Sequence, residues 1–474
     1  MKTMTSPNRR RFMQATATTL AAGYWTGTAP KTIAQPSALN GLSAACIGVG
    51  GKGKVDSEQL AGQGVSIVGL CDVDQELLNK KASVLSSAAK FDDFRECLDQ
   101  LGDKIDLVTV STPDHTHAVA ATDAMRRGKH VYCQKPLTWS IREARVLREL
   151  AADKGVVTQM GNQGTAEDGF RESIDVIRSG AIGDVTEVHA WTNRPVWPQG
   201  DLPPADAAAV PKTLNWDNWI GPAPMRPFVP ERYHTFAWRG WFDFGTGALG
   251  DMACHTVNMP AMALKLFDPM SVTCLSKTGE SKDGQAFPER STVRIEFPQR
   301  ERFGPCDFYW YDGGDLPGKA ITDQLPDWFQ PRIAKHLANP SDRGSRSSGV
   351  VLIGTKGVLF SPDDYGAKYI LLPSDQYVDY MPPQPVLPRI PVQQGRDANH
   401  MWEFVQTIQG EYAPGTLSNF DYAGRVTETV LLGVLALRSQ PGTRILWDSQ
   451  TLTSPSHPAM NEFVHRDYRP GWSI

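Results

Sequence analysis

The segment GVGGKG has the residue types and the spacing of a loop that binds a pyrophosphate. It reads G-x-G-x-x-G, with Gly48, Gly50 and Gly53 at the fixed positions, directly after the apolar run SAACI. Glycine allows a tight turn and lets backbone N–H groups approach phosphate oxygens at the positive end of the following helix. Asp72 stands 19 residues beyond Gly53, where its carboxylate can accept a ribose 2′-hydroxyl and would repel a 2′-phosphate. The pattern predicts a dinucleotide site for NAD rather than NADP.

Two loops carry polar residues at the ends of later apolar runs. In open α/β sheets the ligand lies at the carboxyl ends of the strands, so STPDHTHA (111–118) and CQKPLTW (133–139) should border the cofactor. The residues predicted to form walls of the cofactor pocket are Thr112, Pro113, His117 and Gln134. His115 and His117 could also be interpreted as a pair of metal ligands. No cluster of carboxylates stands near them in the sequence, so we predict no metal site.

Lys135 is the residue of these loops best suited to catalysis. It stands directly before Pro136, at the mouth of an otherwise apolar strand, where an ammonium group can be desolvated and aimed at a bound hydroxyl or carbonyl. The alternative is a solvated lysine that precedes a turn. Because the ligand lies at this edge of the sheet, we predict a catalytic role.

Apolar runs that alternate with helical segments must hold these loops in place. The runs SAACIGVG, GVSIVGLCD, IDLVTVS, HVYCQ and GVVTQMG predict a doubly wound parallel sheet that is covered on both faces. Residues 140–154 have an apolar face, and Ser140 and Glu143 predict a capping box at the start of that helix. After the last run we expect Asn162 to border the cofactor and Gln163 to border the substrate.

The N-terminal stretch NRRRFMQATATTL, residues 8–20, is typical of a twin-arginine signal peptide. Threonines interrupt its apolar run, whereas a membrane anchor needs about 20 strongly apolar residues, so we expect no stable membrane anchor. Residues 1–34 are predicted to be a leader that exports the folded protein to the periplasm or the medium. A disordered basic tail is the alternative.

Charge and cysteine content limit the partners and the compartment. Without the leader the chain loses five basic residues and no acidic one, so its net charge falls from −4 to about −9. Nucleic acid and anionic membranes are poor partners for such a protein. The seven cysteines are odd in number and none are spaced C-x-x-C, which favours buried thiols over disulfides. Folding in the reducing cytoplasm before export agrees with unpaired thiols.

Further motifs give the chain a resemblance to a known family. The glycine loop, TPDHTH, the K-P loop and GALGDMACHTVN are similar to the glucose-fructose oxidoreductase and inositol dehydrogenase family (Gfo/Idh/MocA). LNWDNWIGPAP, WRGWFDFGTGALGDM and the closing FVHRDYRPGW resemble an exported branch of it. The resemblance implies a Rossmann domain at 40–162 and an α+β domain at 163–474 with a large, mostly antiparallel open sheet. It also implies substrate on one face of that sheet, subunit contacts on the other, and hence a homo-oligomer.

The resemblance also implies the reacting residues. The acid and the histidine that the family places four residues apart match Asp251 and His255, and the family's catalytic lysine matches Lys135. One helix face would carry the acid and the histidine, so the carboxylate can orient the imidazole and stabilise its charged form. The family's usual E-K-P is Gln134-Lys135-Pro136 here, which removes a carboxylate beside the lysine. The residues expected to contact the substrate are Gln163, His234 and Arg239.

Aromatic residues crowd the segment 191–241. They are Trp191, Trp197, Trp216, Trp219, Tyr233, Trp238 and Trp241. Flat rings suit the C–H faces of sugars, but the alternative is packing against the sheet, which we expect for at least half of them.

Three functions agree with these residues. The first, which the resemblance implies, is an NAD(P)-dependent oxidoreductase for a sugar, glycoside or cyclitol. In it His255 would exchange the hydroxyl proton, Lys135 would polarise the oxygen and a tightly bound nicotinamide would exchange the hydride. The second is a redox-neutral NAD-dependent glycoside hydrolase, in which transient oxidation permits elimination of the glycosidic substituent. The third is a sugar-binding protein without turnover, which would not need Lys135, Asp251 and His255 together.

Overall fold

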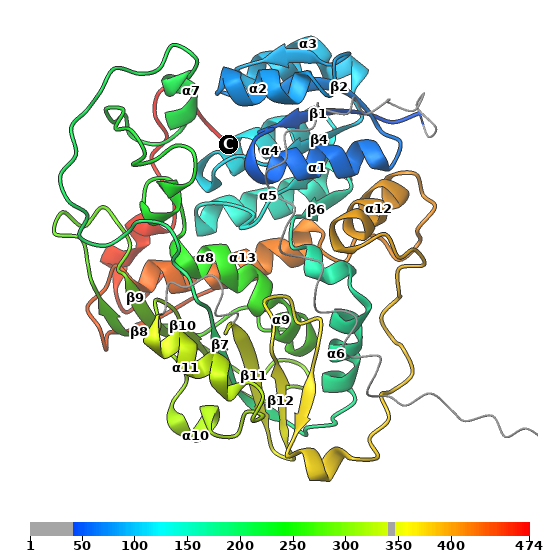
Figure 1. Cartoon of the computed structure of the whole chain (residues 1–474), viewed down its shortest axis with the longest axis vertical. Helices are drawn as coiled ribbons and strands as arrows, with labels where there is room; N and C mark the ends of the chain where they lie inside the picture. The colour runs from blue at the N-terminus through cyan, green and yellow to red at the C-terminus, as the bar shows by residue number, and fades with distance from the viewer. Residues whose placement is uncertain (1–40, 340–346) are drawn as a thin grey trace, which may run out of the picture.

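The structure, a computed structural model, describes residues 41–339 and 347–474, so the predicted leader at 1–34 lies outside it. Two sheets organise the described chain, a parallel sheet in the first third and a larger mixed sheet in the rest (Figure 1). The predicted fold class is confirmed: a doubly wound parallel sheet is followed by an α+β domain with a large, mostly antiparallel sheet.

The first sheet has six parallel strands in the order β3-β2-β1-β4-β5-β6. They are β1 Ser43–Ile47, β2 Ser66–Cys71, β3 Ala89–Phe91, β4 Leu107–Val110, β5 His130–Cys133 and β6 Thr158–Met160. The helices between them are α1 Gly51–Gly62, α2 Gln75–Ala82, α3 Phe94–Leu101, α4 Asp114–Arg126 and α5 Ile141–Lys154. Strand order reverses between β1 and β4, and the loops that follow strands at such a point leave room for a ligand.

Local sequence explains most of these elements. At the start of α5 the Ser140 hydroxyl accepts the Glu143 N–H, and the Glu143 carboxylate accepts the Ser140 N–H at 2.9 Å, which confirms the predicted capping box. The strand β3 has no counterpart among the predicted apolar runs, because only one of its three residues is buried.

The second sheet has eight strands in the order β13-β12-β11-β7-β10-β9-β8-β14, and only β7 and β10 pair in parallel. The strands are β7 Val185–Trp191, β8 Ser271–Thr278, β9 Arg290–Phe297, β10 Cys306–Tyr311, β11 Gly349–Gly354, β12 Val358–Ser361, β13 Ile370–Leu372 and β14 Arg444–Leu446. The helices are α6 Asp168–Arg178, α7 Trp216–Ile220, α8 Gly247–Thr256, α9 Asn258–Leu264, α10 Lys319–Thr322, α11 Gln330–Ala338, α12 Arg396–Ile408 and α13 Phe420–Ala436.

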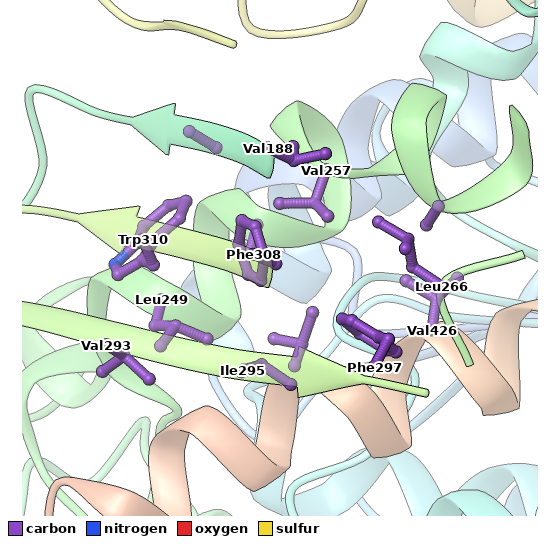
Figure 2. Packing of buried hydrophobic residues seen from close by; sticks show 14 of the residues in the cluster. Val188, Leu249, Val257, Leu266, Val293, Ile295, Phe297, Phe308, Trp310 and Val426 are labelled. Atoms are coloured by element: carbon purple, nitrogen blue, oxygen red, sulfur yellow. The ribbon is translucent and has the colours of Figure 1, made fainter. Parts of the chain in front are cut away.

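Helix α8 positions the predicted reacting residues by packing on this sheet. Leu249 on α8 and Val257 at its end lie against side chains of β9 and β10 (Figure 2). Positions four residues apart share a helix face, so Asp251 and His255 lie on the opposite face, which is turned away from the sheet. The buried sheet residues beneath α8 and α13 include Val293, Ile295, Phe297, Phe308 and Trp310.

The C-terminal part of the chain returns to the first domain. Met401, Phe404 and Val405 of α12 join the buried cluster that β1 and α1 form, and α12 lies beside α1 in Figure 1. Helix α13 packs against α5, so it contacts both domains. All seven cysteines are buried and unpaired, as the sequence predicts. Within the described ranges, none of the helices combines the length and the apolar character of a transmembrane span.

Candidate active site

A cavity of about 640 Å³ lies where the carboxyl edge of the parallel sheet meets the second domain. The first domain contributes the glycine loop and the loops after β2, β3, β4 and β5. The second domain contributes α8, Arg194, the segments 218–239, 364–365 and 396–397, and Trp472. The predicted site residues that line it are Gly48, Gly50, Asp72, Thr112, Pro113, Gln134, Lys135, Gln163, His234, Arg239, Asp251 and His255. The fold therefore joins residues that are more than 200 positions apart in the sequence.

The glycine loop has the geometry that a dinucleotide requires. Gly48 has a φ of +78°, and a Cβ on it would lie 2.6 Å from the Ser111 carbonyl oxygen. A Cβ on Gly53 would lie 2.0 Å from the Gly48 oxygen, so the close packing of α1 on the loop excludes a side chain there. Gly50 and Gly51 line the cavity where α1 begins, which places the positive helix end at its wall. This cradle fits a pyrophosphate.

Asp72 directly follows β2 and lies against the glycine loop. Its Oδ2 accepts the N–H groups of Val49 at 2.9 Å and Gly50 at 3.2 Å, and its Oδ1 accepts the Asp74 N–H at 3.0 Å. Burial raises the pKa of Asp72, and these three donors oppose the rise. The carboxylate therefore lies where a ribose bound beside the loop would meet it.

The predicted lysine is held by the predicted acid. Lys135 Nζ lies 2.8 Å from Asp251 Oδ1 and donates to the Asp251 carbonyl oxygen at 2.7 Å. Arg239 Nε lies 3.4 Å from the same carboxylate oxygen. Burial raises the pKa of Asp251, but the charges of Lys135 and Arg239 outweigh burial and hold that pKa well below its usual value. Asp251 is thus a permanent anion that fixes the ammonium at the cavity wall.

His255 lies one helical turn beyond Asp251 and is held by packing. The family resemblance implies a carboxylate that orients the imidazole, but Asp251 instead contacts two cations, Lys135 and Arg239. No hydrogen bond joins Asp251 to His255 in the described chain. Instead the ring packs edge-on against Tyr365, with centroids 4.9 Å apart. Nδ1 is buried without a hydrogen-bond partner among the described residues, which leaves Nε2 to meet a ligand.

Burial and the nearby charge of Lys135 hold the pKa of His255 well below its usual value. The imidazole is therefore neutral around pH 7 and can accept a proton. In this arrangement a cation and a neutral base face one cavity, which is the combination that oxidation of an alcohol requires.

A buried acid at the start of α4 was not predicted from the sequence. Asp114 lines the cavity, and its Oδ2 accepts the Thr246 hydroxyl at 2.7 Å. Burial raises the pKa of Asp114 to about 7, against the lowering effects of Thr246 and Arg239. Asp114 consequently changes charge near neutral pH.

Asp114→Asn should remove part of the pH dependence of stability. Asparagine still accepts the Thr246 hydroxyl but cannot ionise. The wild-type pKa of Asp114 is about 7 in the fold, whereas it is ~4 in an unfolded chain, so the wild type loses stability as pH rises between these values. Between pH 4.5 and pH 8 the free energy of unfolding of the wild type should therefore fall by ~1–3 kcal/mol more than that of the variant. Denaturant unfolding at the two pH values measures this difference. Identical pH slopes would contradict the assignment.

Three predicted cofactor residues lie behind the cavity wall. Gly53 packs closely against the Gly48 carbonyl group and does not line the cavity. His117 connects the loops after β4 and β5. Its Nδ1 lies 2.8 Å from the Pro136 carbonyl oxygen and its Nε2 lies 2.9 Å from the Thr112 carbonyl oxygen. Asn162 is fully buried, and its Oδ1 accepts the Ser418 hydroxyl. These residues support the lining rather than contribute to it.

His115 is likewise enclosed by backbone. Its Nε2 lies 2.9 Å from the Trp219 oxygen and its Nδ1 lies 3.2 Å from the Phe244 oxygen. Burial lowers the pKa of His115 to about 3. Across residues 41–339 and 347–474, no group of three or more His, Cys, Asp or Glu side chains is arranged to hold a metal ion.

Several lining residues carry no local sequence signal. Asp364 and Tyr365 follow β12, and Arg396 begins α12 with its Cζ 3.7 Å from the Tyr365 ring centroid. Asp364 Oδ1 is buried without a partner among the described residues, and burial raises the pKa of Asp364 while the charge of Arg194 opposes the rise. Arg194 and Asp364 both line the cavity, so the guanidinium offers a donor and the carboxylate an acceptor for hydroxyl groups.

Two family models match this chain. The Gfo/Idh/MocA model, which describes an oxidoreductase family with an NAD-binding Rossmann fold, matches residues 42–162. The model of the same family's C-terminal alpha/beta domain matches residues 184–275. The chain belongs to the Gfo/Idh/MocA family.

The individual relatives of known sequence are only distantly similar to this chain. Inositol 2-dehydrogenase of Salmonella typhimurium is 27% identical over 152 residues, which are 31% of this chain and 45% of that protein. Glycosyl hydrolase family 109 protein 2 of Akkermansia muciniphila is 32% identical over 160 residues, which are 31% of this chain and 33% of that protein. The chain thus spans less than half of the length of these curated relatives.

Solved structures share the fold over most of the chain. An inositol dehydrogenase homologue from Azotobacter vinelandii, complexed with NADH and myo-inositol, has a TM-score of 0.56 at 17% identity and covers 88% of this chain and 99% of its own. The WlbA dehydrogenase from Bordetella pertussis, in complex with NADH and UDP-GlcNAcA, has a TM-score of 0.56 at 13% identity, over 85% and 98%. At such identities the likeness concerns the fold.

This Gfo/Idh/MocA chain replaces the glutamate of E-K-P with Gln134, and the structure gives a physical reason. Gln134 Nε2 donates to Oδ2 of the buried Asp56 at 2.8 Å, and Ser111 donates to the same oxygen at 2.8 Å. Burial raises the pKa of Asp56, and the charge of Lys52, 3.4 Å away, opposes the rise. Asp56 supplies a carboxylate at this point, so the residue at 134 must be a donor.

Gln134→Glu should therefore destabilise the protein. A second carboxylate would face Asp56, and one of the two would have to bind a proton. We expect a loss of ~1–3 kcal/mol in the free energy of unfolding at pH 7.5, and a smaller loss at pH 5. The double variant Gln134→Glu/Asp56→Asn restores a donor–acceptor pair and should recover most of the loss. Equal stability of Gln134→Glu and wild type at pH 7.5 would refute this role.

Proposed function

We propose that this Gfo/Idh/MocA protein is an NAD-dependent oxidoreductase that acts on a hydroxyl group of a sugar, a glycoside or a cyclitol. The observation that carries the proposal is that one cavity contains the glycine cradle together with Lys135, Asp251 and His255. A protein that only binds sugar would need no ammonium held on a buried carboxylate beside a neutral imidazole. The match to an inositol 2-dehydrogenase supports the substrate class.

The residues of the cavity fit a nicotinamide dinucleotide. The cradle at Gly48 and Gly50 would hold the pyrophosphate, and Asp72 would accept a ribose hydroxyl, which favours NAD over NADP. Thr112, Pro113 and Gln134 would border the cofactor farther along the sheet edge. When bound, the nicotinamide ring supplies hydride transfer to and from the substrate carbon.

The chain's own residues would handle the proton and the developing charge. Neutral His255, which lines the cavity, would accept the hydroxyl proton through Nε2 as the carbon is oxidised. Lys135 would donate a hydrogen bond to the same oxygen while negative charge develops on it. Asp251 would stay ionised and keep the ammonium in place. Arg194, Asp364 and the predicted contacts Gln163 and Arg239 would bind the remaining hydroxyl groups.

A substrate panel tests the proposal. The purified protein is loaded with NAD⁺, and in parallel with NADP⁺, and mixed with aldoses, alditols, glycosides and cyclitols. Absorbance of the reduced nicotinamide is followed, and products are identified by mass spectrometry. Reduction of bound NAD⁺ with formation of a keto product supports the oxidoreductase. Loaded protein that reacts with no member of the panel favours the sugar-binding protein.

A redox-neutral glycoside hydrolase is the second candidate, because one partial relative is a family 109 glycosyl hydrolase. The same residues would serve, since oxidation of the sugar acidifies the adjacent C–H bond and permits elimination of the glycosidic group. Release of an aglycone without net reduced cofactor would identify this activity in the same panel.

Export and assembly complete the proposal. Free NAD is scarce outside the cytoplasm, so a folded chain exported by the predicted twin-arginine leader would carry a tightly bound cofactor with it. Such a cofactor would be restored in each cycle by a second substrate or by the redox-neutral route. A homo-oligomer remains part of this proposal, with contacts on the open sheet.

A further inference from the structure

A segment of the second domain crosses over to the first domain just beyond Asp72. Its residues Trp216, Trp219, Tyr233, Trp238 and Trp241 pack mainly on one another rather than on the large sheet. The segment's base is fixed where Trp219 and Phe244 enclose His115 of α4. We call residues 213–218, together with the C-terminal residues 469–472, the clasp.

The clasp pairs with the backbone that follows β2. The Gln75 N–H donates to the Thr213 oxygen at 2.8 Å, and the Asn215 N–H donates to the Val73 oxygen at 2.9 Å. This short antiparallel bridge joins the chain on both sides of Asp74 to the second domain. Asp74 Oδ2 also lies 2.8 Å from His234 Nε2.

Side chains extend these contacts to the loop after β3. Asn215 Nδ2 donates to Asp92 Oδ2 at 3.1 Å, and Asn218 Nδ2 donates to the Asp92 oxygen at 3.1 Å. The side-chain oxygen Oδ1 of Asn218 accepts a hydrogen bond from Arg95 Nη2 at 3.3 Å. The tip of the clasp is thus attached to the ends of two neighbouring parallel strands by polar contacts.

The C-terminus closes the other side. Trp472 lies with its ring centroid 4.3 Å from the guanidinium of Arg95 and 6.0 Å from the ring of Phe94. Arg469 ties the C-terminal part of the clasp to residues 213–218, because its Nη2 donates to the Asp217 carbonyl oxygen at 2.9 Å. In Figure 1 the end of the chain lies beside α4 and close to α7.

These contacts enclose one end of the cavity that contains the glycine loop. Asp92, Phe94, Asn218 and Trp472 line it together with Asp72. In a doubly wound sheet the pyrophosphate lies on the glycine loop and the ribose lies on the acid after the second strand. The base attached to that ribose must therefore lie beyond Asp72, where the clasp and the loop after β3 meet.

We propose that the clasp completes the adenosine subsite of the cofactor, so that NAD(H) leaves only when the clasp opens. The inference rests on the proposed function, and it assigns cofactor retention to residues of the second domain and of the C-terminus. The cofactor stays bound between turnovers and during export, because its adenosine end is walled on both sides. Asn218 and Trp472 contribute most directly, since both line the cavity and contact the opposite domain.

The rate of NADH release tests the proposal. Full-length wild type, Asn218→Ala, Trp472→Ala and the double variant are loaded with NADH, and the loss of bound fluorescence is followed after addition of excess NAD⁺. Each single variant should release NADH about tenfold faster, because each loses one or two partly buried contacts, and the double variant faster still. Lys212→Ala is the control, because Lys212 is exposed on the same segment and does not line the cavity. Release at the wild-type rate from all variants would overturn the clasp while leaving the proposed function intact.

A second measurement needs no variant. Hydrogen exchange of the Gln75 and Asn215 amides reports opening of the bridge in the wild type, and bound NADH should slow it at least tenfold if the cofactor and the clasp support each other. Unchanged exchange with NADH bound would also overturn the proposal. Wild-type protein that binds no NADH would overturn both this inference and the proposed function.

Discussion

His255→Ala should lower turnover by about 10²–10⁴-fold while the bound NAD(H) is retained. The variant loses the only neutral imidazole that faces the cavity from α8, so the hydroxyl proton has no acceptor when the hydride leaves. The lost side chain packs on Tyr365 and makes no described hydrogen bond through Nδ1, so the rest of the site should keep its geometry. Single-turnover reduction of bound NAD⁺ by a substrate from the panel measures the effect.

His457→Ala provides the matched control, because His457 lies near the C-terminus and does not line the cavity. It should turn over as the wild type does. Nucleotide content, measured after denaturation, must be equal in the three proteins. Wild-type turnover in His255→Ala would show that the proton acceptor is another residue.

Lys135→Met should lower turnover by about 10²–10³-fold and shift the pH dependence of what remains. The variant loses the ammonium that would stabilise the developing oxyanion. Burial is the main cause of the low pKa of His255 and the charge of Lys135 is the next, so loss of the ammonium raises that pKa. A proton acceptor must be neutral, and activity is therefore lost as pH falls through its pKa. The acid limb of the rate profile should move to higher pH in Lys135→Met.

The double variant Lys135→Met/Asp251→Asn separates chemistry from stability. Lys135→Met alone leaves the Asp251 carboxylate with Arg239, 3.4 Å away, as its remaining partner in the described chain, which costs stability. Asp251→Asn removes that charge, so the double variant should recover stability but not turnover. Recovery of turnover would mean that Lys135 serves only to balance Asp251.

The parallel sheet and its loops could be predicted because their signals are local. Apolar runs, the capping box at Ser140 and the glycine spacing each occupy one short stretch of chain. The strand β3 could not be predicted, because a local signal is absent: two of its three residues are exposed, so the sequence has no apolar run there. The positions of the predicted Lys135 and Asp251 came from motifs, and the structure brings their side chains to 2.8 Å.

The residues that complete the site could not be found locally. Tyr365 and Arg396 reach the cavity through strand pairing and through the return of α12 to the first domain. The spacing of residues in the sequence could not predict the partners of Asp251. A shared helix face brings His255 near Asp251, but only the tertiary fold brings Lys135 and Arg239 into contact with it. The aromatic crowd at 216–241 forms its own cluster, and spacing alone cannot distinguish that from packing on the sheet.

The nucleotide content of the purified protein shows whether the chain carries NAD. The purified full chain is denatured, and NAD(H) and NADP(H) in the supernatant are measured per chain. We expect close to one equivalent of NAD(H) and little NADP(H), because the glycine cradle and Asp72 select NAD and the clasp retains it. Protein that carries no nucleotide, and that binds none when NAD⁺ or NADH is added, would contradict both the proposed cofactor site and the role of the clasp.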